Sequence, residues 1–241
     1  MKIGSVVVRH LGLLALFASG VFASAPSRAV PAFTVDINAG GAVLSLTQAD
    51  FTCTQGGTVC SDSGLSAGGM QFDLGFNVNT DPSLSASVSV LNNSGGTQQF
   101  TALFTATGVG TSGNLTLTEG GISGGATSNT KAGATLAAPA GSAFYTALID
   151  GAKYLPLLYP NPFSLPVPAS MSANFADASF GPNQPGPAIV DSVGIKLDFT
   201  LTDQDSASMS GTFNLKPVPE PGTALLLGVG LVLMARRERR R

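Results

Sequence analysis

Alternation of apolar and polar residues is the dominant pattern between residues 24 and 217. Phe72, Leu74, Phe76 and Val78 occupy every second position, with polar or small residues between them. The same alternation recurs in four further segments: 84–90, 100–106, 193–201 and 209–215. Successive side chains of a strand point to opposite faces, so this pattern predicts strands with one buried and one wet face. Such strands are typical of antiparallel sheets.

Two sheets of this kind, packed face to face, form a β-sandwich. No long stretch shows helical periodicity, and no fixed repeat period favours a solenoid. The sequence therefore predicts an all-β fold, an antiparallel β-sandwich of about nine to eleven strands. The last two segments, 193–201 and 209–215, flank Asp203-Gln204-Asp205-Ser206. That turn-like sequence predicts a hairpin between them.

Glycine and proline mark the expected breaks between strands. Gly95-Gly96, Gly120-Gly121 and Gly124-Gly125 predict loops, as does the segment 181–187. Residues 143–154 predict a strand, with one short helix as the alternative. The segment 155–168 holds five prolines, which exclude a central strand. It predicts an extended, polyproline-like crossing between the sheets, or alternatively an apolar loop that binds a partner.

The first 23 residues have the features of a secretory signal peptide. Lys2 and Arg9 form a basic start, Leu11 to Ala23 are apolar, and Val21-Phe22-Ala23 offers a cleavage site. Ala25 offers a second site, and an uncleaved membrane helix is the alternative. Residues 1–23 thus predict export by the Sec machinery and cleavage by signal peptidase. Residues 24–217 are then the exported domain, a length that suits one β-sandwich.

Charge in the body differs from charge in the chain as a whole. Between residues 30 and 217 four lysines face twelve acidic residues, a net charge of −8, whereas the whole chain has −2 because arginines gather at its end. An acidic body repels nucleic acid phosphates, so we expect no nucleic-acid partner. Low charge density and acidity suit an extracellular surface protein.

Cys53 and Cys60 are the only two cysteines. In an oxidising compartment such a pair predicts a disulfide, which would enclose a loop containing Gly56-Gly57. Zinc binding is disfavoured because the single histidine, His10, lies in the predicted signal peptide. We therefore expect no metal site and no cofactor.

Catalytic patterns are missing from the exported domain. Without a histidine it has no Ser-His-Asp or Cys-His arrangement, and no glycine-rich phosphate loop follows a strand. The closest carboxylate pair, Asp203 and Asp205, lies in the predicted turn, where aspartate bonds locally to backbone. We expect no enzymatic activity, and a secreted enzyme of unrecognised type is one alternative.

A ligand-binding module is the other alternative. Asp198, Asp203 and Asp205 could supply oxygen ligands for calcium, although their spacing fits no EF-hand. Carbohydrate sites commonly use aromatic platforms, and this chain has no tryptophan and three tyrosines. The sequence thus leaves a carbohydrate- or calcium-binding surface module as an open alternative.

Residues 218–241 have a three-part organisation. Pro219-Glu220-Pro221 is followed by an uncharged apolar run, Thr223 to Ala235, and then by Arg236, Arg237, Glu238, Arg239, Arg240 and Arg241. Prolines hold the backbone extended. The apolar run falls short of the about 20 residues that cross a bilayer comfortably, and the arginines stay on the cytoplasmic side. The pattern predicts a short transmembrane helix with an arginine membrane stop.

This tail resembles the PEP-CTERM sorting domain, which an exosortase processes. Pro219, Glu220 and Pro221 match the sorting motif, and the terminal arginines match its basic end. Tails of this kind are also labelled ice-binding protein C-terminal domains, but the body has only isolated Thr-x-Thr pairs. The resemblance implies a Gram-negative bacterium with an exosortase and exopolysaccharide. It also implies a precursor held transiently in the inner membrane, then a structural or adhesive role at the cell surface or in the biofilm matrix.

Overall fold

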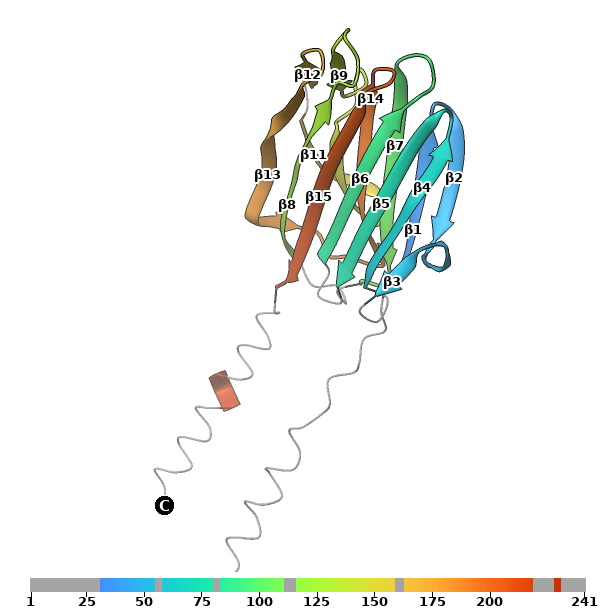
Figure 1. Cartoon of the computed structure of the whole chain (residues 1–241). Coiled ribbons are helices and arrows are strands. Elements are labelled where there is room, and N and C mark those ends of the chain that lie inside the picture. The colour runs from blue at the N-terminus through green and yellow to red at the C-terminus, as the bar shows by residue number, and fades with distance from the viewer. Residues whose placement is uncertain are drawn as a thin grey trace, which may run out of the picture.

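Two antiparallel sheets pack face to face as a sandwich (Figure 1). The computed structural model describes residues 31–54, 58–79, 83–110, 116–158, 163–218 and 228–230. In these ranges strands account for nearly all of the regular structure, and one 3-10 turn, η1 (Gln48–Asp50), interrupts them. The predicted all-β antiparallel sandwich is therefore confirmed.

The seven-stranded sheet has the order β13-β8-β15-β6-β5-β4-β3. Its strands are β3 (Thr52–Thr54), β4 (Val59–Ala67), β5 (Met70–Asn79), β6 (Ser83–Asn92), β8 (Thr116–Thr127), β13 (Ser172–Gly186) and β15 (Ser206–Pro217). Three of them, β4, β5 and β6, follow one another as a meander because Gly68-Gly69 and the 80–82 connection are short.

The eight-stranded sheet has the order β11-β10-β14-β7-β1-β2, with β9 beside β14 and β12 beside β9. Its strands are β1 (Ala32–Ala39), β2 (Ala42–Thr47), β7 (Gln98–Thr107), β9 (Ala134–Ala137), β10 (Tyr145–Ile149), β11 (Ala152–Leu157), β12 (Ser164–Val167) and β14 (Ser192–Leu201). Strands β9 and β10 both pair with β14, at successive parts of its length.

The alternating segments of the sequence form the core as predicted. The apolar positions of β5, β6, β7, β14 and β15 are buried between the sheets, among them Phe72, Phe76, Val88, Phe104, Ile195 and Phe213. Aromatic rings join the two layers. Phe33 of β1 stacks on Phe76 of β5 with centroids 4.3 Å apart, and Phe72 meets Phe100 of β7 edge-on at 5.4 Å. Each such pair adds about 1 kcal/mol beyond area burial.

The predicted hairpin between residues 193–201 and 209–215 is wrong. Strand β14 belongs to the eight-stranded sheet and β15 to the seven-stranded sheet, so the connection crosses the sandwich. Asp205 is fully buried at the crossing, where its carboxylate accepts hydrogen bonds from Thr202 Oγ1 (2.6 Å) and Asn129 N (3.0 Å). Alternation shows which face of each strand is buried but not which strand lies beside it. The turn sequence is compatible with a hairpin within one sheet and with a crossing between the sheets.

Two of the three glycine pairs do not mark loops. Gly95-Gly96 lies in a loop as predicted, whereas Gly120-Gly121 and Gly124-Gly125 lie inside β8. A Cβ on Gly120 would lie 2.6 Å from the Phe180 ring and 2.7 Å from Thr212 O. Glycine in β8 therefore permits a close approach of neighbouring strands, which is its other common use in sheets.

The described residues contain fifteen strands, more than the predicted nine to eleven. Short strands such as β3, β9 and β12 carry too few residues for alternation to reveal them. Residues 181–186, predicted as loop, continue β13 as an irregular edge strand with two register shifts. Residues 145–149 and 152–157 form strands, so the helical alternative for 143–154 is excluded.

The proline-rich segment forms edges in place of a crossing. Residues 152–157 are β11 and residues 164–167 are β12, both at the margin of the eight-stranded sheet. This agrees with the exclusion of a central strand, since edge strands tolerate proline.

Both ends of the described domain lie at one end of the sandwich, called here the tail end (Figure 1). Ala32 begins β1 opposite Thr107, and Pro217 ends β15 opposite Thr116. Strands β7 and β8 follow one another, so these two pairs share an end. The predicted signal peptide, residues 1–23, lies outside the described residues.

Candidate functional site

The sorting segment begins where a central strand ends. Strand β15 lies between β6 and β8 and pairs with both almost throughout its length, up to Pro217 opposite Thr116. Leu215 and Phe213 on this strand are buried in the core. Because β15 is paired on both sides, the strand that precedes the sorting segment is firmly held in the folded domain.

The residues of the tail itself lie almost wholly outside the described part. Pro219, Glu220, Pro221, Arg236, Arg237, Arg239, Arg240 and Arg241 are all outside it. Residues 228–230, within the expected transmembrane segment, are helical. In the described ranges no helix is both long and apolar enough for a membrane crossing.

A backbone clamp holds the tail end of the eight-stranded sheet. Asp150, in the turn between β10 and β11, accepts hydrogen bonds from the backbone N–H groups of Val190 (2.9 Å), Asp191 (2.8 Å) and Ser192 (2.9 Å). Desolvation by burial acts to raise the pKa of Asp150, but these N–H donors outweigh it and hold that pKa below its ordinary value. Sequence reasoning missed this role, although Asp150-Gly151 is a recognisable turn pair.

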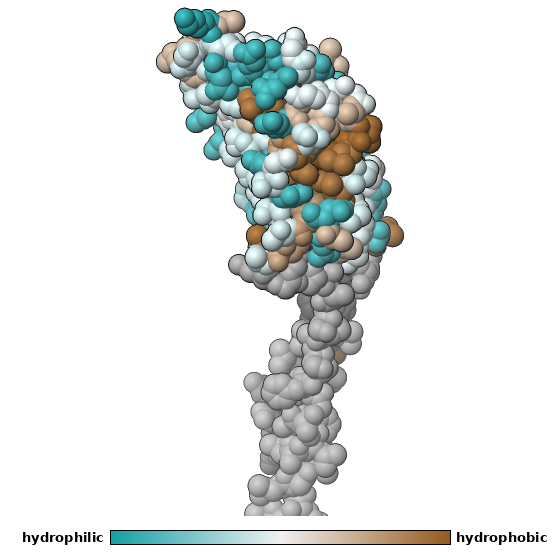
Figure 2. Space-filling view, turned by 45° about the vertical axis from the view of Figure 1, so that its right-hand side comes forward, coloured by the Kyte–Doolittle hydropathy of each residue, from teal (hydrophilic) through white to brown (hydrophobic). Residues whose placement is uncertain are grey.

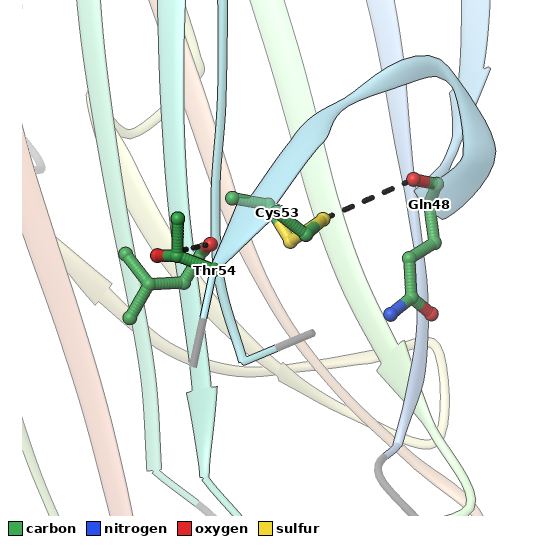
Figure 3. Close-up of a disulfide and its surroundings, with 5 residues drawn as sticks. Gln48, Cys53 and Thr54 are labelled. Carbon is green, nitrogen blue, oxygen red and sulfur yellow. Dashed lines mark hydrogen bonds between the residues drawn. A yellow bond between two sulfur atoms is a disulfide. The ribbon is translucent and has the colours of Figure 1, made fainter. Parts of the chain in front are cut away.

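The predicted disulfide is confirmed. Cys53 of β3 and Cys60 of β4 lie directly opposite each other and are bonded, with an S–S distance of 2.04 Å. Figure 3 shows the bridge beside η1, with Cys53 Sγ 4.0 Å from the carbonyl oxygen of Gln48. A bridged sulfur has no proton to donate, so this is a contact rather than a hydrogen bond. The bridge fixes the short strand β3 to the edge of the seven-stranded sheet.

The three aspartates considered as calcium ligands are used separately. Asp198 accepts hydrogen bonds from Gln99 Nε2 (2.7 Å) and Thr101 Oγ1 (3.1 Å). It also forms an ion pair with Lys196 Nζ at 2.9 Å. Asp203 accepts the N–H of Gly95 at 2.8 Å, and Asp205 holds the crossing between the sheets. Within the described ranges no group of three His, Cys, Asp or Glu side chains is placed to hold a metal ion.

The outer face of the seven-stranded sheet is lined by small hydroxyls. Ser85, Ser87 and Ser89 of β6 lie opposite Thr212, Ser210 and Ser208 of β15. These side chains carry no charge, and no hydrogen bond within the described residues engages their hydroxyls. Beside them an open hollow of about 440 Å³ is lined by residues that include Ser89, Ser208, Asn174 and Asp177. This face can present hydroxyl donors and acceptors to a polar, neutral surface.

Comparison with protein families places the tail. Residues 217–241 match the family model of the PEP-CTERM protein-sorting motif. No curated protein matches the chain. The matched range contains the Pro-Glu-Pro residues and the terminal arginines, so the resemblance read from the sequence is confirmed. The motif marks an exported protein with a membrane-anchored precursor that an exosortase sorts.

Proposed function

We propose that the protein is a structural or adhesive component of the cell surface or biofilm matrix of a Gram-negative bacterium. In this proposal, signal peptidase removes residues 1–23 after Sec export, and residues 218–241 hold the precursor in the inner membrane. The exosortase then recognises Pro219-Glu220-Pro221 and releases the sandwich outward. The observation that carries the proposal is the sorting motif at residues 217–241, joined directly to a compact disulfide-bonded β-sandwich.

The arrangement of the ends supports this role. The sorting segment leaves the tail end of the sandwich, and the predicted signal peptide precedes β1 at that same end. Processing at both sites therefore takes place on one side of the folded domain, away from the loops at its other end. The sandwich can fold before the tail is cut.

A non-catalytic role is part of the proposal. The exported domain lacks histidine. Its most buried carboxylates, Asp198 and Asp205, are occupied by hydrogen bonds that join strands and loops. Carboxylates used in this way hold the fold and are poorly placed to exchange protons with a substrate.

The surface proposed to meet exopolysaccharide is the hydroxyl face of β6 and β15. Neutral sugar polymers offer many hydroxyls and little charge, which suits exposed serines whose hydroxyls have no partner among the described residues. Contacts of this kind are individually weak, so adhesion would depend on many copies.

Cell fractionation of the native host, with and without its exosortase, tests the sorting step. We expect a shortened species outside the inner membrane in the first strain and a full-length, membrane-bound species in the second. The same full-length species in both strains would contradict the proposal.

Binding to the host's purified exopolysaccharide tests the adhesive role. A triple variant, Ser87→Lys with Ser208→Lys and Ser210→Lys, should lose co-sedimentation with the polymer. The matched control places three lysines on exposed positions away from this face (Ala32→Lys, Thr34→Lys, Val190→Lys) and should retain it. A melting temperature that rises with calcium and falls with a chelator would instead favour the calcium-binding alternative.

A further inference from the structure

Edges of the two sheets differ in how they are protected against pairing with another chain. Strand β11 carries Lys153 and Pro156 and has a register shift against β10, and the short β12 carries Pro166. Strand β13 has two register shifts and prolines at 182 and 185. Bulges, prolines and charges are the devices by which edge strands avoid association.

The edge formed by β3 and β4 is protected as well. The disulfide fixes β3 over the first part of β4. Beyond β3, strand β4 shifts register between Asp62 and Leu65, and Gly64 adopts a φ of +72°. The carboxylate of Asp73 accepts the N–H of Gly64 at 2.8 Å, so this backbone donor is already engaged.

Within its own six residues, strand β2 carries no bulge, proline or charge. The neighbouring carboxylate of Asp50 engages the backbone N–H of Thr47, at one end of the strand. Its six residues, Ala42-Val43-Leu44-Ser45-Leu46-Thr47, run in unbroken register with β1 and include no charge and no proline. Val43 is 73% exposed, far more than is usual for a large apolar side chain in a strand. A regular, apolar, uncharged edge is the type that pairs with another strand.

Backbone directions identify the open groups. Gly40 N donates to Gln99 O on the β7 side. Because backbone directions alternate along a strand, the N–H and C=O groups of Ala39 and Ile37 point toward β2. The backbone N–H and C=O groups of their partners Ala42 and Leu44 point toward β1. Those of Val43, Ser45 and Thr47 therefore point the other way, toward the open edge of the sheet. Thr47 N confirms this direction, because it donates outward to Asp50 Oδ2 at 2.7 Å. Among the described residues, no partner engages the backbone N–H and C=O groups of Val43 and Ser45.

Beside this edge lies an apolar seam between the two sheets. Leu44 of β2 and Leu65 and Ala67 of β4 pack against the core but are only partly buried. Figure 2 shows an apolar patch on the side of the sandwich where β2 and β4 lie. A single added strand would cover β2 alone, whereas a second sandwich would also bring its own apolar seam against this one.

We propose that β2 is a self-pairing edge, at which two copies of the mature protein join antiparallel to form one continuous sheet. The two-fold axis passes at Leu44, so that Leu44 lies beside Leu44 of the second copy. Val43 of each copy then exchanges backbone hydrogen bonds with Ser45 of the other. Both sets of open groups are satisfied by this single register.

Charge favours a second copy over a charged peptide. The body carries a net charge of −8, so copies repel unless they meet at an uncharged strip. Residues 42–47 are such a strip and offer no charge for a basic or acidic partner to recognise. The nearest carboxylate of β1, Asp36, accepts a hydrogen bond from Ser45 Oγ at 2.6 Å.

The geometry also determines when pairing can occur. Antiparallel β2 strands place the tail ends of the two copies at opposite ends of the dimer. Two precursors anchored in the same membrane cannot pair in this way, whereas processed copies can. This timing rests on the proposed function, but the pairing itself does not. An edge six residues long is about 20 Å, which makes a small interface and a weak, concentration-dependent dimer.

Cysteine cross-linking of exported protein tests the pairing. Cys53 and Cys60 are already bonded to each other, so a single introduced cysteine is the only thiol available for a cross-link between copies. We expect Leu44→Cys to give a disulfide-linked dimer and Val190→Cys, at a valine that is 82% exposed, to give none. Equal cross-linking of both variants, or a Leu44→Cys product with a different protein, would overturn the proposal.

Sedimentation velocity supplies a second readout that needs no cross-link. Wild-type protein should show a monomer–dimer equilibrium, and Val43→Lys should weaken it about tenfold through like charges near the axis. Val190→Lys adds the same charge elsewhere and should leave the equilibrium unchanged. A wild-type protein that stays monomeric as its concentration rises would refute self-pairing. Cross-linking of Leu44→Cys precursors in the strain without exosortase would refute only the timing.

Discussion

Strands β14 and β15 follow each other in the chain, yet their surroundings differ. Strand β14 is buried on its inner face and over much of its outer face, where Asp198 is 3% exposed. Strand β15 alternates strictly between buried apolar residues and exposed serines such as Ser208 and Ser210. The two outer faces of the sandwich therefore serve different purposes: that of β14 holds a closed polar network, and that of β15 is open to solvent.

The greatest loss of stability is predicted for a change on the inner face of β14. Phe199→Ala removes a fully buried ring that contacts Phe100 and Phe144, and should lower the free energy of unfolding by about 3–5 kcal/mol. Ser210→Ala on the outer face of β15 is the matched control and should change it by less than about 0.5 kcal/mol. Urea denaturation of both variants measures the difference. Similar losses in the two would contradict the contrast.

The second prediction concerns the closed network on the outer face of β14. Asp198→Ala removes the common acceptor of Gln99, Thr101 and Lys196, and should cost about 2–3 kcal/mol. Ser208→Ala, on the outer face of β15, should be nearly neutral. Thermal unfolding followed by circular dichroism compares them, and a neutral Asp198→Ala would show that the network does not stabilise the fold.

A smaller effect is expected where the two sheets are joined by a hydroxyl. Tyr145 of β10 is buried, and its Oη donates to the carbonyl oxygen of Thr212 on β15 at 2.7 Å. Tyr145→Phe removes this hydrogen bond from a buried site and should cost about 1 kcal/mol. Burial raises the pKa of the Tyr145 phenol, so tyrosine absorbance in alkaline titration should show one group that resists ionisation until the protein unfolds. Tyr145→Phe should remove that group from the titration.

The smallest effect concerns the start of β14 and depends on pH. Asp150→Ala removes the acceptor of three backbone N–H groups and should cost about 1 kcal/mol at neutral pH. The folded-state pKa lies below the unfolded value near 3.8, so this stabilisation is present above pH 3.8 and is lost as the pH falls through the folded pKa. The difference between wild type and Asp150→Ala should therefore shrink in strong acid, to the pH-independent cost of placing alanine at a φ of +50°. A difference that grows in acid would contradict the clamp.

The sequence patterns predicted where the main strands lie but not which strands pair with one another. The positions that face the core in β5, β6 and β7 could be predicted because alternation reports burial directly. The partner of β14 could not, since a turn such as Asp203-Gln204-Asp205 suits both a hairpin and a crossing. The glycines of β8 misled for a related reason: their purpose is contact with Phe180 and β15, which only the assembled sheet reveals.

The candidate site divides in the same way. The disulfide and the sorting motif depend on residues close together in sequence, and both could be found from it. The Asp150 clamp, the Asp198 network and the open edge at β2 depend on strands distant in sequence, and therefore required the structure. Asp203 and Asp205 looked like a pair from their spacing, yet they bond to separate loops.

Intact-mass spectrometry of the protein recovered outside the inner membrane is the sharpest check on sorting by the tail. We expect a single chain that begins near Ser24, lacks the apolar run and the terminal arginines, and retains the Cys53–Cys60 bridge. A chain outside the membrane that still ends in Arg239-Arg240-Arg241 would contradict it.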